Sequence, residues 1–162
     1  MVKILFYRKM DSLIGRITLI ADETNLKRIL FEDEEDAMLK EAEMSEDSEI
    51  LIQAFDELSE YFNGNLKEFK VSTDPDGTEF QKRCWNVLKT IEYGKTISYE
   101  EQAICLGDKN KMRAVGNANG KNPVPIIIPC HRVIGKSGKL VGYGGGIHIK
   151  EFLLNLEGKH NE

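Results

Sequence analysis

The first third of the chain carries short runs of β-branched and aromatic residues between polar segments, which is the pattern of a small sheet. The polar segments at 10–12 and 22–25 supply the expected turns. Further along, apolar residues recur at helical spacing over 49–62, and the pattern stops at Asn63 and Gly64. We therefore predict a small antiparallel sheet that one amphipathic helix covers. The three predicted strands span 2–7, 15–21 and 26–31.

The second half of the chain carries helix-start signals. Thr78 is followed by Gln81 and Ser98 by Glu101, and each pair matches the capping box that satisfies backbone donors at a helix start. A stretch rich in turn formers over 70–77 precedes both signals, and we place the domain boundary there. The predicted domains are 1–73 and 77–158.

Three helices are predicted after this boundary: one that ends before Gly94, one over 99–106, and one that begins near Asn110 and holds 112–118. The short turn over 107–109 gives the last two the spacing of a helix-turn-helix, although helix pairs of this kind also occur in any helical core. The predicted fold class is α/β, with an N-terminal α/β domain and a mainly helical C-terminal domain.

Charge divides the chain at the same place. Residues 1–77 hold 9 Lys and Arg against 19 Asp and Glu, a balance of −10, whereas residues 78–162 hold 13 against 8, a balance of +5. A basic half is where a polyanion such as DNA would bind, so the global charge of −5 does not exclude nucleic acid. Two solvated surfaces of one protein explain the same imbalance, and charge alone leaves both interpretations open.

Several classes of protein are excluded by composition. No stretch approaches the ~20 apolar residues of a membrane span, and the apolar start of the chain is too short for a signal peptide, so we predict a cytoplasmic protein without membrane contact. Three cysteines without metal-type spacing predict neither a disulfide framework nor a zinc site. Cys84 and Cys105 lie on apolar helix faces and are interpreted as small core residues.

The predicted helix over 112–118 is lined with small residues, namely Ala114, Gly116 and Ala118. Glycine inside a helix costs ~1 kcal/mol relative to alanine, so some gain must offset it. Close packing between helices is one explanation. Close approach to a narrow groove of DNA is the other, with Arg113 projecting from the helix start, and the charge division favours it.

Candidate chemistry centres on Cys130. Three prolines between 123 and 129 exclude helix, and predict an extended apolar arm that ends at this cysteine. His131 and Arg132 bring positive charge near the sulfur, which would favour the nucleophilic thiolate. Because neighbouring side chains of an extended chain point to opposite faces, a water would have to link His131 to the sulfur.

A histidine that acts as a base needs a carboxylate on its other ring nitrogen, and Glu157 is the local candidate. It follows a predicted helix over 149–156, which Gly158 would end, and a glutamate in a last turn opposes the helix dipole unless it has a partner elsewhere. An exposed glutamate is the alternative. Between the two candidates lies a glycine-rich stretch over 142–146, where the backbone could approach a ligand closely.

These motifs together resemble the O6-alkylguanine-DNA alkyltransferases, also called methylated-DNA–protein-cysteine methyltransferases. The resemblance is close over 77–158, whereas the N-terminal part resembles the family only in its order of strands and helix. It implies a ribonuclease-H-like α/β N-terminal domain and a helix-turn-helix C-terminal domain. The matching residues are Thr78, Phe80-Gln81, Trp85, Tyr93-Gly94, Ser98-Tyr99, Arg113-Ala114-Val115-Gly116, Asn122-Pro123-Val124-Pro125, Pro129-Cys130-His131-Arg132-Val133, Gly142-Tyr143, Gly145-Gly146, Lys150 and Glu157-Gly158.

The resemblance implies a single-turnover repair reaction, in which Cys130 takes the alkyl group from O6-alkylguanine, or from O4-alkylthymine as a further substrate. His131 would act as base through a water, Glu157 would orient it, and Tyr99 would assist protonation of the leaving base. The implied partner is double-stranded DNA, bound by a monomer. No cofactor and no metal are expected, because the lesion and the sulfur supply both reacting groups and the N-terminal segment has no cysteine or histidine.

The resemblance also implies a set of DNA-binding residues. Arg113 would enter the base stack in place of a flipped nucleotide, while the second motif helix lies in the minor groove. Asn122 would brace the turn before the cysteine arm, and Asn119 would face the groove at a position that is often apolar in the family, as is that of Gln102. The remaining implied contacts are Ala114 in the groove, Tyr143 as a pocket wall, and the carbonyls of Cys130 and Val133 with the amide of Gly144 at the guanine edge.

Two other functions remain open from the residues alone. A non-catalytic lesion sensor would share the fold, but relatives of that kind replace the cysteine. A thiol hydrolase or peptidase would use Cys130 and His131, but leaves the Arg113 helix and the basic half unexplained.

Overall fold

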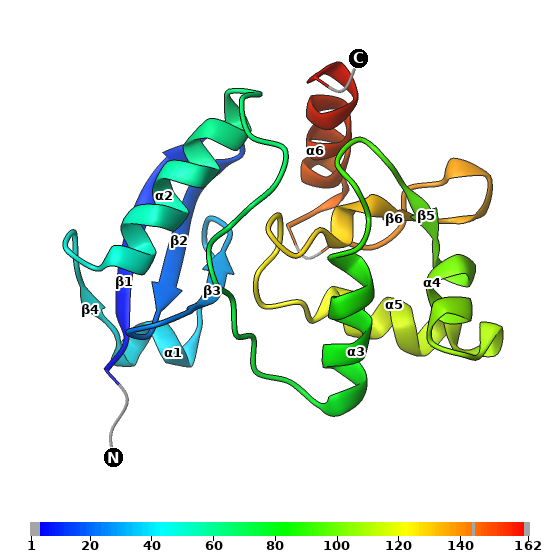
Figure 1. The fold of residues 1–162 in the computed structure, drawn as a ribbon, viewed down its shortest axis with the longest axis horizontal. Coiled ribbons are helices and arrows are strands. Elements are labelled where there is room, and N and C mark those ends of the chain that lie inside the picture. The colour runs from blue at the N-terminus through cyan, green and yellow to red at the C-terminus, as the bar shows by residue number, and fades with distance from the viewer. Residues whose placement is uncertain (1–3, 144, 161–162) are drawn as a thin grey trace. The chain divides into compact units, whose positions relative to one another are not determined.

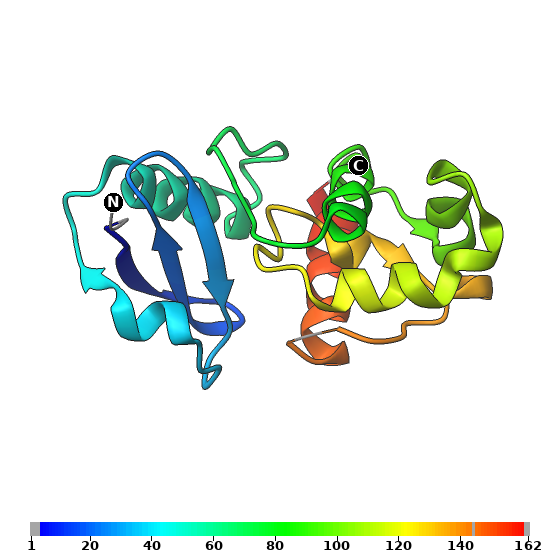
Figure 2. The same ribbon diagram turned by 90° about the horizontal axis from the view of Figure 1, so that it is seen from below.

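A computed structural model describes residues 4–143 and 145–160, which divide into two compact units, Met1–Asp76 and Gly77–Glu162. The predicted domains end at 73 and 158, a few residues short of these limits. In the first unit, four strands form one sheet in the order β3-β2-β1-β4 (Figures 1 and 2). The strands are β1 (Phe6–Ser12), β2 (Gly15–Ala21), β3 (Leu26–Leu30) and β4 (Glu43–Met44).

The sheet differs from the predicted one in two respects. β4 pairs with β1 in parallel, after the short helix α1 (Ala37–Glu41), so the sheet is mixed and not purely antiparallel. The first hairpin also turns later than the polar segment 10–12 suggests, because β1 continues to Ser12, which pairs with Gly15. Asp11 and Arg16 form an ion pair across the two strands, so these polar residues sit in the ladder. Residues 2 and 3 of the first predicted strand lie outside the described residues.

Helix α2 (Glu49–Phe62) lies along one face of this sheet, as its apolar stripe predicts (Figure 1). Its bounds are those predicted from the sequence. Ser48 caps its start by accepting a hydrogen bond from the Leu51 amide. The fully buried side chains of Leu51 and Leu58 fill the space between helix and sheet, where buried apolar area stabilises the fold by about 25 cal/mol per Å².

The segment that leaves the first unit is bound to β3. The amide of Leu26 donates to the Ser72 carbonyl at 2.8 Å, and the Asp74 amide donates to the Leu26 carbonyl at 3.1 Å. Next to them, the ammonium of Lys27, whose side chain is only 4% exposed, contacts carboxylate oxygens of Asp74 and Asp76, each at 3.1 Å. The first compact unit therefore extends to Asp76.

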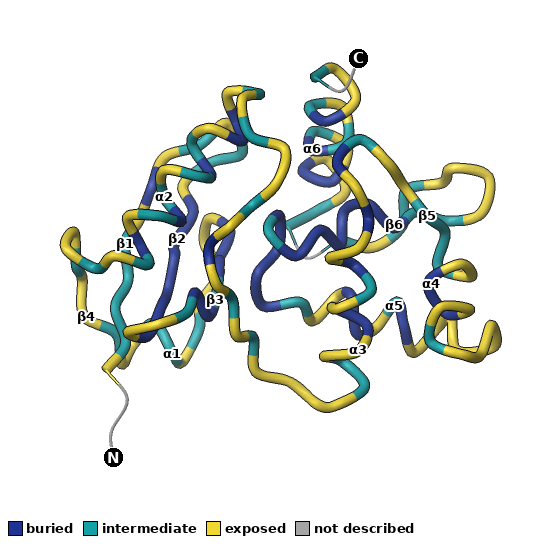
Figure 3. The backbone as a smooth tube through the Cα atoms, in the orientation of Figure 1, coloured by how far each residue is buried: buried dark blue, intermediate teal, exposed yellow. Residues whose placement is uncertain are grey.

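The second unit is mainly helical, with one two-stranded parallel sheet. Both predicted capping boxes are formed, at Thr78 and at Ser98. Helices α3, α4 and α5 pack on one another, and a buried segment before β6 runs beside them (Figure 3). The elements are α3 (Glu79–Leu88), β5 (Ile97–Ser98), α4 (Tyr99–Cys105), a 3-10 turn (Lys109–Lys111), α5 (Met112–Gly120), a 3-10 turn (Cys130–Arg132), β6 (Val133–Ile134), a 3-10 turn (Lys136–Gly138) and α6 (Ile147–His160).

Helix α6 is longer than predicted. Gly158 lies inside it and does not end it, because this glycine does not adopt the left-handed backbone that terminates helices. Glu157 therefore stands within the helix, with its side chain on the same face as the buried residues Lys150 and Leu153. No helix in the described part of the chain is long and apolar enough to cross a membrane.

Candidate active site

Cys130 begins a single 3-10 turn, Cys130–Arg132, directly before β6. The segment 123–128 before it consists of bends and turns, so the predicted extended arm is wrong. Ile126 even adopts a left-handed backbone, with φ of 75°, and its side chain is fully buried. Prolines exclude helix here as expected, but the apolar residues fold into a compact loop and not into a strand. The residue Cys130 itself is 8% exposed.

Asn122 holds this loop closed. Its side-chain amide donates to the Ile128 carbonyl at 2.7 Å, and its side-chain oxygen accepts from the Val124 amide at 3.0 Å. A further hydrogen bond, from the Ile128 amide to the Val124 carbonyl, closes the loop at 2.9 Å. One side chain thus fixes both ends of the segment that presents the cysteine.

The two residues after Cys130, His131 and Arg132, form a buried cluster with Glu157 of α6. The His131 Nε2 atom lies 2.6 Å from Glu157 Oε2. Arg132 donates to both oxygens of the same carboxylate, from Nε at 2.8 Å and from Nη2 at 3.0 Å, and its Nη1 donates to the Ile91 carbonyl at 2.7 Å. Glu157 is thus a buried partner and not an exposed glutamate.

The charges of this cluster follow from its burial and its hydrogen bonds. Burial raises the pKa of Glu157, but the hydrogen bonds and charges of His131 and Arg132 outweigh it and hold this pKa at about 2. Burial lowers the pKa of His131 and outweighs the opposing contribution of Glu157, while the nearby charges of Arg132 and Lys150 lower it further. At neutral pH, an ionised carboxylate therefore accepts a hydrogen bond from a neutral imidazole.

A neutral imidazole that donates from Nε2 has an unprotonated Nδ1. In His131 this Nδ1 is buried and has no hydrogen-bond partner among the described residues. Buried nitrogen atoms without partners are rare in folded proteins, so a polar group that reaches Nδ1 during function is expected. A base held in one tautomer by a carboxylate is the arrangement that accepts a proton from a nucleophile.

The resting state of Cys130 differs from the prediction. Burial raises the pKa of its thiol, and the hydrogen bond from Asn122 and the charge of Lys150 compensate only in part. The expected stabilisation of the thiolate by Arg132 is therefore wrong, because this guanidinium is already bound to Glu157. A protonated thiol at rest requires a base when it reacts.

Tyr99 and Lys150 form a second polar group beside the cysteine. The Tyr99 hydroxyl donates to the Val141 carbonyl at 3.1 Å, and the Lys150 ammonium donates to the same carbonyl at 3.0 Å. Lys150 Nζ also lies 3.5 Å from the Tyr99 hydroxyl oxygen. Burial lowers the pKa of Lys150 and raises that of Tyr99, and the negative charge of Cys130 in its thiolate form raises both.

Lys150 is one of the residues that match the family, but it was given no role in the site, although its spacing along the helix also points to the site. It stands three residues before Leu153 and seven before Glu157, so helical spacing places all three on one face. A lysine on the apolar face of a helix is unusual, because a lysine is rarely fully buried unless its charge has a partner.

Helix α5 exposes one face and buries the other. Arg113 and Ala114 are exposed at its start, as predicted for residues that meet DNA. Asn119, predicted to face the groove, is instead buried, because its side-chain amide is hydrogen-bonded to the buried side-chain amide of Gln102 in α4. The DNA contact of Asn119 is therefore corrected to an internal one.

The remaining predicted pocket residues are only partly defined. Val133 is fully buried and pairs with Ile97 in the small parallel sheet. Tyr143 is half-buried, whereas Gly144 lies outside the described residues. Their predicted contacts with a guanine stay predictions.

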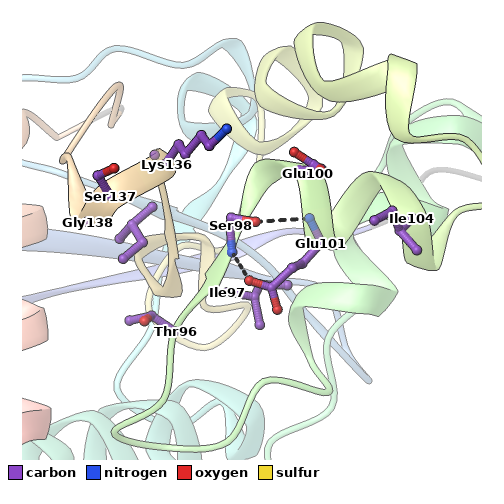
Figure 4. A pocket seen from close by; sticks show the side chains of 11 residues that line it. Thr96, Ile97, Ser98, Glu100, Glu101, Ile104, Lys136, Ser137 and Gly138 are labelled. Atoms are coloured by element: carbon purple, nitrogen blue, oxygen red, sulfur yellow. Dashed lines mark hydrogen bonds between the residues drawn. The ribbon is translucent and has the colours of Figure 1, made fainter.

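A separate cavity of about 400 Å³ opens beside the start of α4 (Figure 4). Ser98 and Glu101, which form the capping box at the start of α4, are among its lining residues, and Lys136 and Ser137 line it from the turn after β6. The cavity does not include the cysteine or the buried cluster. It lies next to the first turn of α4, which begins at Tyr99.

Comparison with known proteins assigns both units. Residues 5–75 match the ribonuclease-like domain of 6-O-methylguanine DNA methyltransferase, and residues 79–159 match its DNA-binding domain. The chain belongs to the 6-O-methylguanine DNA methyltransferase family. The predicted family and fold class are thereby confirmed, as are direct alkyl transfer from DNA to a cysteine of the protein and binding to DNA.

Individual members of this family cover nearly the whole chain. The methylated-DNA–protein-cysteine methyltransferase of Methanosarcina acetivorans is 47% identical over 154 residues, which are 95% of this chain and 99% of that protein. The enzyme of the same name from Mycobacterium tuberculosis is 48% identical over 93% of this chain and 91% of its own length. A crystal structure of the M. tuberculosis protein in complex with DNA superimposes with a TM-score of 0.90 at 45% identity, covering 96% of this chain and 94% of that one.

Proposed function

We propose that this methyltransferase repairs O6-alkylguanine in double-stranded DNA by moving the alkyl group to Cys130, once per molecule. The observation that carries the proposal is the His131 Nδ1 atom, which is buried without a hydrogen-bond partner among the described residues, while Nε2 lies 2.6 Å from Glu157 Oε2. A base in this state directly after a buried thiol suits nucleophilic catalysis by sulfur. O4-alkylthymine is proposed as a further substrate.

The proposed reaction balances without a cofactor. The proton of the Cys130 thiol passes through a bridging water to His131 Nδ1, and the sulfur attacks the alkyl carbon. A carbon–sulfur bond forms while the carbon–O6 bond breaks, and the guanine leaves with the electron pair. The Tyr99 hydroxyl, beside the Lys150 ammonium, assists protonation of the departing base. We propose that the thioether is stable, so each molecule acts once.

The proposed approach to DNA uses the exposed face of α5. Ala114 and Gly116 leave room for close contact, and Arg113 fills the stack that a flipped nucleotide vacates. We propose that the carbonyls of Cys130 and Val133 contact the edge of the flipped base and that Tyr143 forms a wall of its pocket. We further propose that the protein acts as a monomer in the cytoplasm, where its three free cysteines stay reduced.

The proposed function is tested by intact-mass measurement of the protein after incubation with duplex DNA that carries O6-methylguanine. The expected result is a gain of one CH2 unit per molecule, located on Cys130 by peptide mapping. Saturable binding of the lesion without a mass change would instead support a lesion sensor. Repeated turnover of an ester or peptide would support a thiol hydrolase, and either result would contradict the proposal.

Replacing Arg113 by alanine is expected to slow transfer from a duplex lesion by about 10- to 100-fold, because extruding a base costs a few kcal/mol that the arginine helps to offset. Transfer from the free base O6-benzylguanine, which needs no extrusion, is expected to stay within about twofold of the unmodified protein. Single-turnover rates on both substrates check this. The matched control is Lys111→Ala, which removes an exposed cation two residues earlier. Equal loss on both substrates would contradict a role for Arg113 in base extrusion.

A further inference from the structure

Gln102 and Asn119 form a buried pair of side-chain amides between helices α4 and α5. Gln102 Nε2 donates to Asn119 Oδ1 at 3.0 Å, and Asn119 Nδ2 donates to Gln102 Oε1 at 2.7 Å. The Gln102 side chain is fully buried, and Asn119 is 6% exposed. Two reciprocal hydrogen bonds of this kind fix both the distance and the relative orientation of the two side chains.

The pair also reaches the third helix of this unit. Gln102 Nε2 has a second partner, the Cys84 carbonyl of α3, at 3.2 Å. Both N–H groups of this amide are thus used, one toward α5 and one toward α3. The pair therefore ties three helices together at a single point in their shared core.

The pair lies close in sequence to two residues of the proposed site. Gln102 stands three residues after Tyr99, one turn along α4, and Asn119 stands three residues before Asn122, which closes the loop of Cys130. The pair thus lies one turn from the proposed proton donor on one side and one turn from the brace of the cysteine loop on the other.

An apolar contact at this place would not specify the same arrangement. Apolar packing is non-directional, whereas a buried amide with an unmet hydrogen bond is costly, so a slide between α4 and α5 would break bonds that water cannot replace. A buried polar pair is known to fix register in other helical assemblies at some cost in stability. A buried polar pair between α4 and α5 would fix the register of these two helices in the same way.

We infer that the Gln102–Asn119 pair is a positioning element for alkyl transfer, which keeps the Tyr99 turn of α4 in register with the Asn122 turn after α5. The inference rests on the proposed roles of Tyr99 and Asn122. It concerns the rate of transfer in the bound complex and not the affinity for DNA, because both side chains are buried inside the protein.

The test compares an apolar pair with a swapped pair. The double variant Q102L/N119A removes both amides at nearly constant combined volume, and the double variant Q102N/N119Q keeps both amides and their combined length. For each folded protein we measure the dissociation constant for lesion duplex and the first-order transfer rate of the active fraction at saturating DNA.

We expect the apolar pair to keep the dissociation constant within about twofold and to lower the transfer rate about tenfold, since small misplacements of reacting groups have effects of that size or larger. The swapped pair is expected to recover most of the rate. A purely structural role would lower the melting temperature and the active fraction but leave the rate of the folded fraction unchanged, and that result would overturn the inference. A swapped pair as slow as the apolar pair would also overturn it.

If the apolar pair does not fold, the isosteric variant N119D serves instead. It keeps the bond from Gln102 Nε2 but places two oxygens against each other at the second bond, and the expected transfer rate is again about tenfold lower. A rate equal to that of the unmodified protein would overturn the inference. The unmodified protein is measured in parallel, so that a failure of the proposed function, which would show as no methyl transfer at all, is distinguished from a failure of the positioning element.

Discussion

Replacing Cys130 by alanine is expected to abolish methyl transfer from O6-methylguanine duplex completely. The sulfur is the atom to which the new bond forms, so no other group in the buried cluster can substitute for it. Truncation at a site that is 8% exposed removes one atom and is expected to cost roughly 1 kcal/mol of stability, so the variant should fold and still bind DNA. Intact mass and a binding isotherm on the same duplex measure both quantities.

The other two cysteines supply the controls for this variant. Cys105 is exposed at the end of α4, so its interpretation as a core residue is wrong, and Cys105→Ala is expected to transfer at the unmodified rate. Cys84 is buried in α3, and burial raises the pKa of its thiol more than the charges of Arg83 and Lys111 lower it. A mass gain of the Cys130→Ala variant, located on either remaining cysteine, would show that Cys130 is not the alkyl acceptor.

Replacing Glu157 by glutamine is expected to lower the transfer rate by about 10²- to 10⁴-fold. Arg132 donates to both carboxylate oxygens, whereas a glutamine can offer it only one acceptor. Its NH2 group would then face His131 and favour the tautomer with a proton on Nδ1, which leaves no acceptor for the thiol proton. Single-turnover quench measurements at saturating DNA give this rate directly.

The matched control is Glu151→Gln, which makes the same charge change at an exposed position of the same helix. It is expected to leave the rate unchanged. Glu157→Gln is also expected to lower the free energy of unfolding by roughly 3 to 5 kcal/mol, because it leaves a buried arginine without its counter-ion. A variant that transfers at more than a tenth of the unmodified rate would contradict the role of Glu157 in orienting the histidine.

Acid unfolding gives a second measure of the same carboxylate. The pKa of Glu157 is about 2, below its ordinary value of 4.5, so its contribution to stability is present above pH 4.5 and is lost as the pH falls toward 2. By linkage this contribution is of order 3 kcal/mol. The lowered pKa of His131 acts with the same sign, beginning near its ordinary value of 6.5. Urea unfolding between pH 7 and 3 is expected to show both losses of unfolding free energy. Glu157→Gln should lack the loss that begins below pH 4.5.

Much of the architecture follows from local sequence signals. The capping boxes at Thr78 and Ser98 set two helix starts because the bonds they make are local, and the apolar stripe of α2 gives its bounds. The pairing of His131 with Glu157 was also predictable, since a base needs an orienting carboxylate and a glutamate in the last turn of a helix opposes the helix dipole. These inferences depend on residues close together in sequence, or on the need of a catalytic histidine for a carboxylate partner.

Other features depend on packing between elements, which one sequence does not reveal. The loop before Cys130 bends because the side chain of Asn122 closes it, and three prolines fit that loop as well as a strand. Asn119 turns inward because its side chain is hydrogen-bonded to that of Gln102, a contact between residues 17 positions apart. The raised pKa of the Cys130 thiol likewise follows from burial that charge patterns do not show.

The ion pairs of Lys27 with Asp74 and Asp76 bear on how the N-terminal unit can be produced alone. A fragment that stopped at residue 73 would leave the almost fully buried Lys27 ammonium without either counter-charge, and would lose the hydrogen bond from the Asp74 amide to the Leu26 carbonyl of β3. Such a truncated polypeptide should aggregate during purification, while one extended by three residues should behave as a well-formed folding unit.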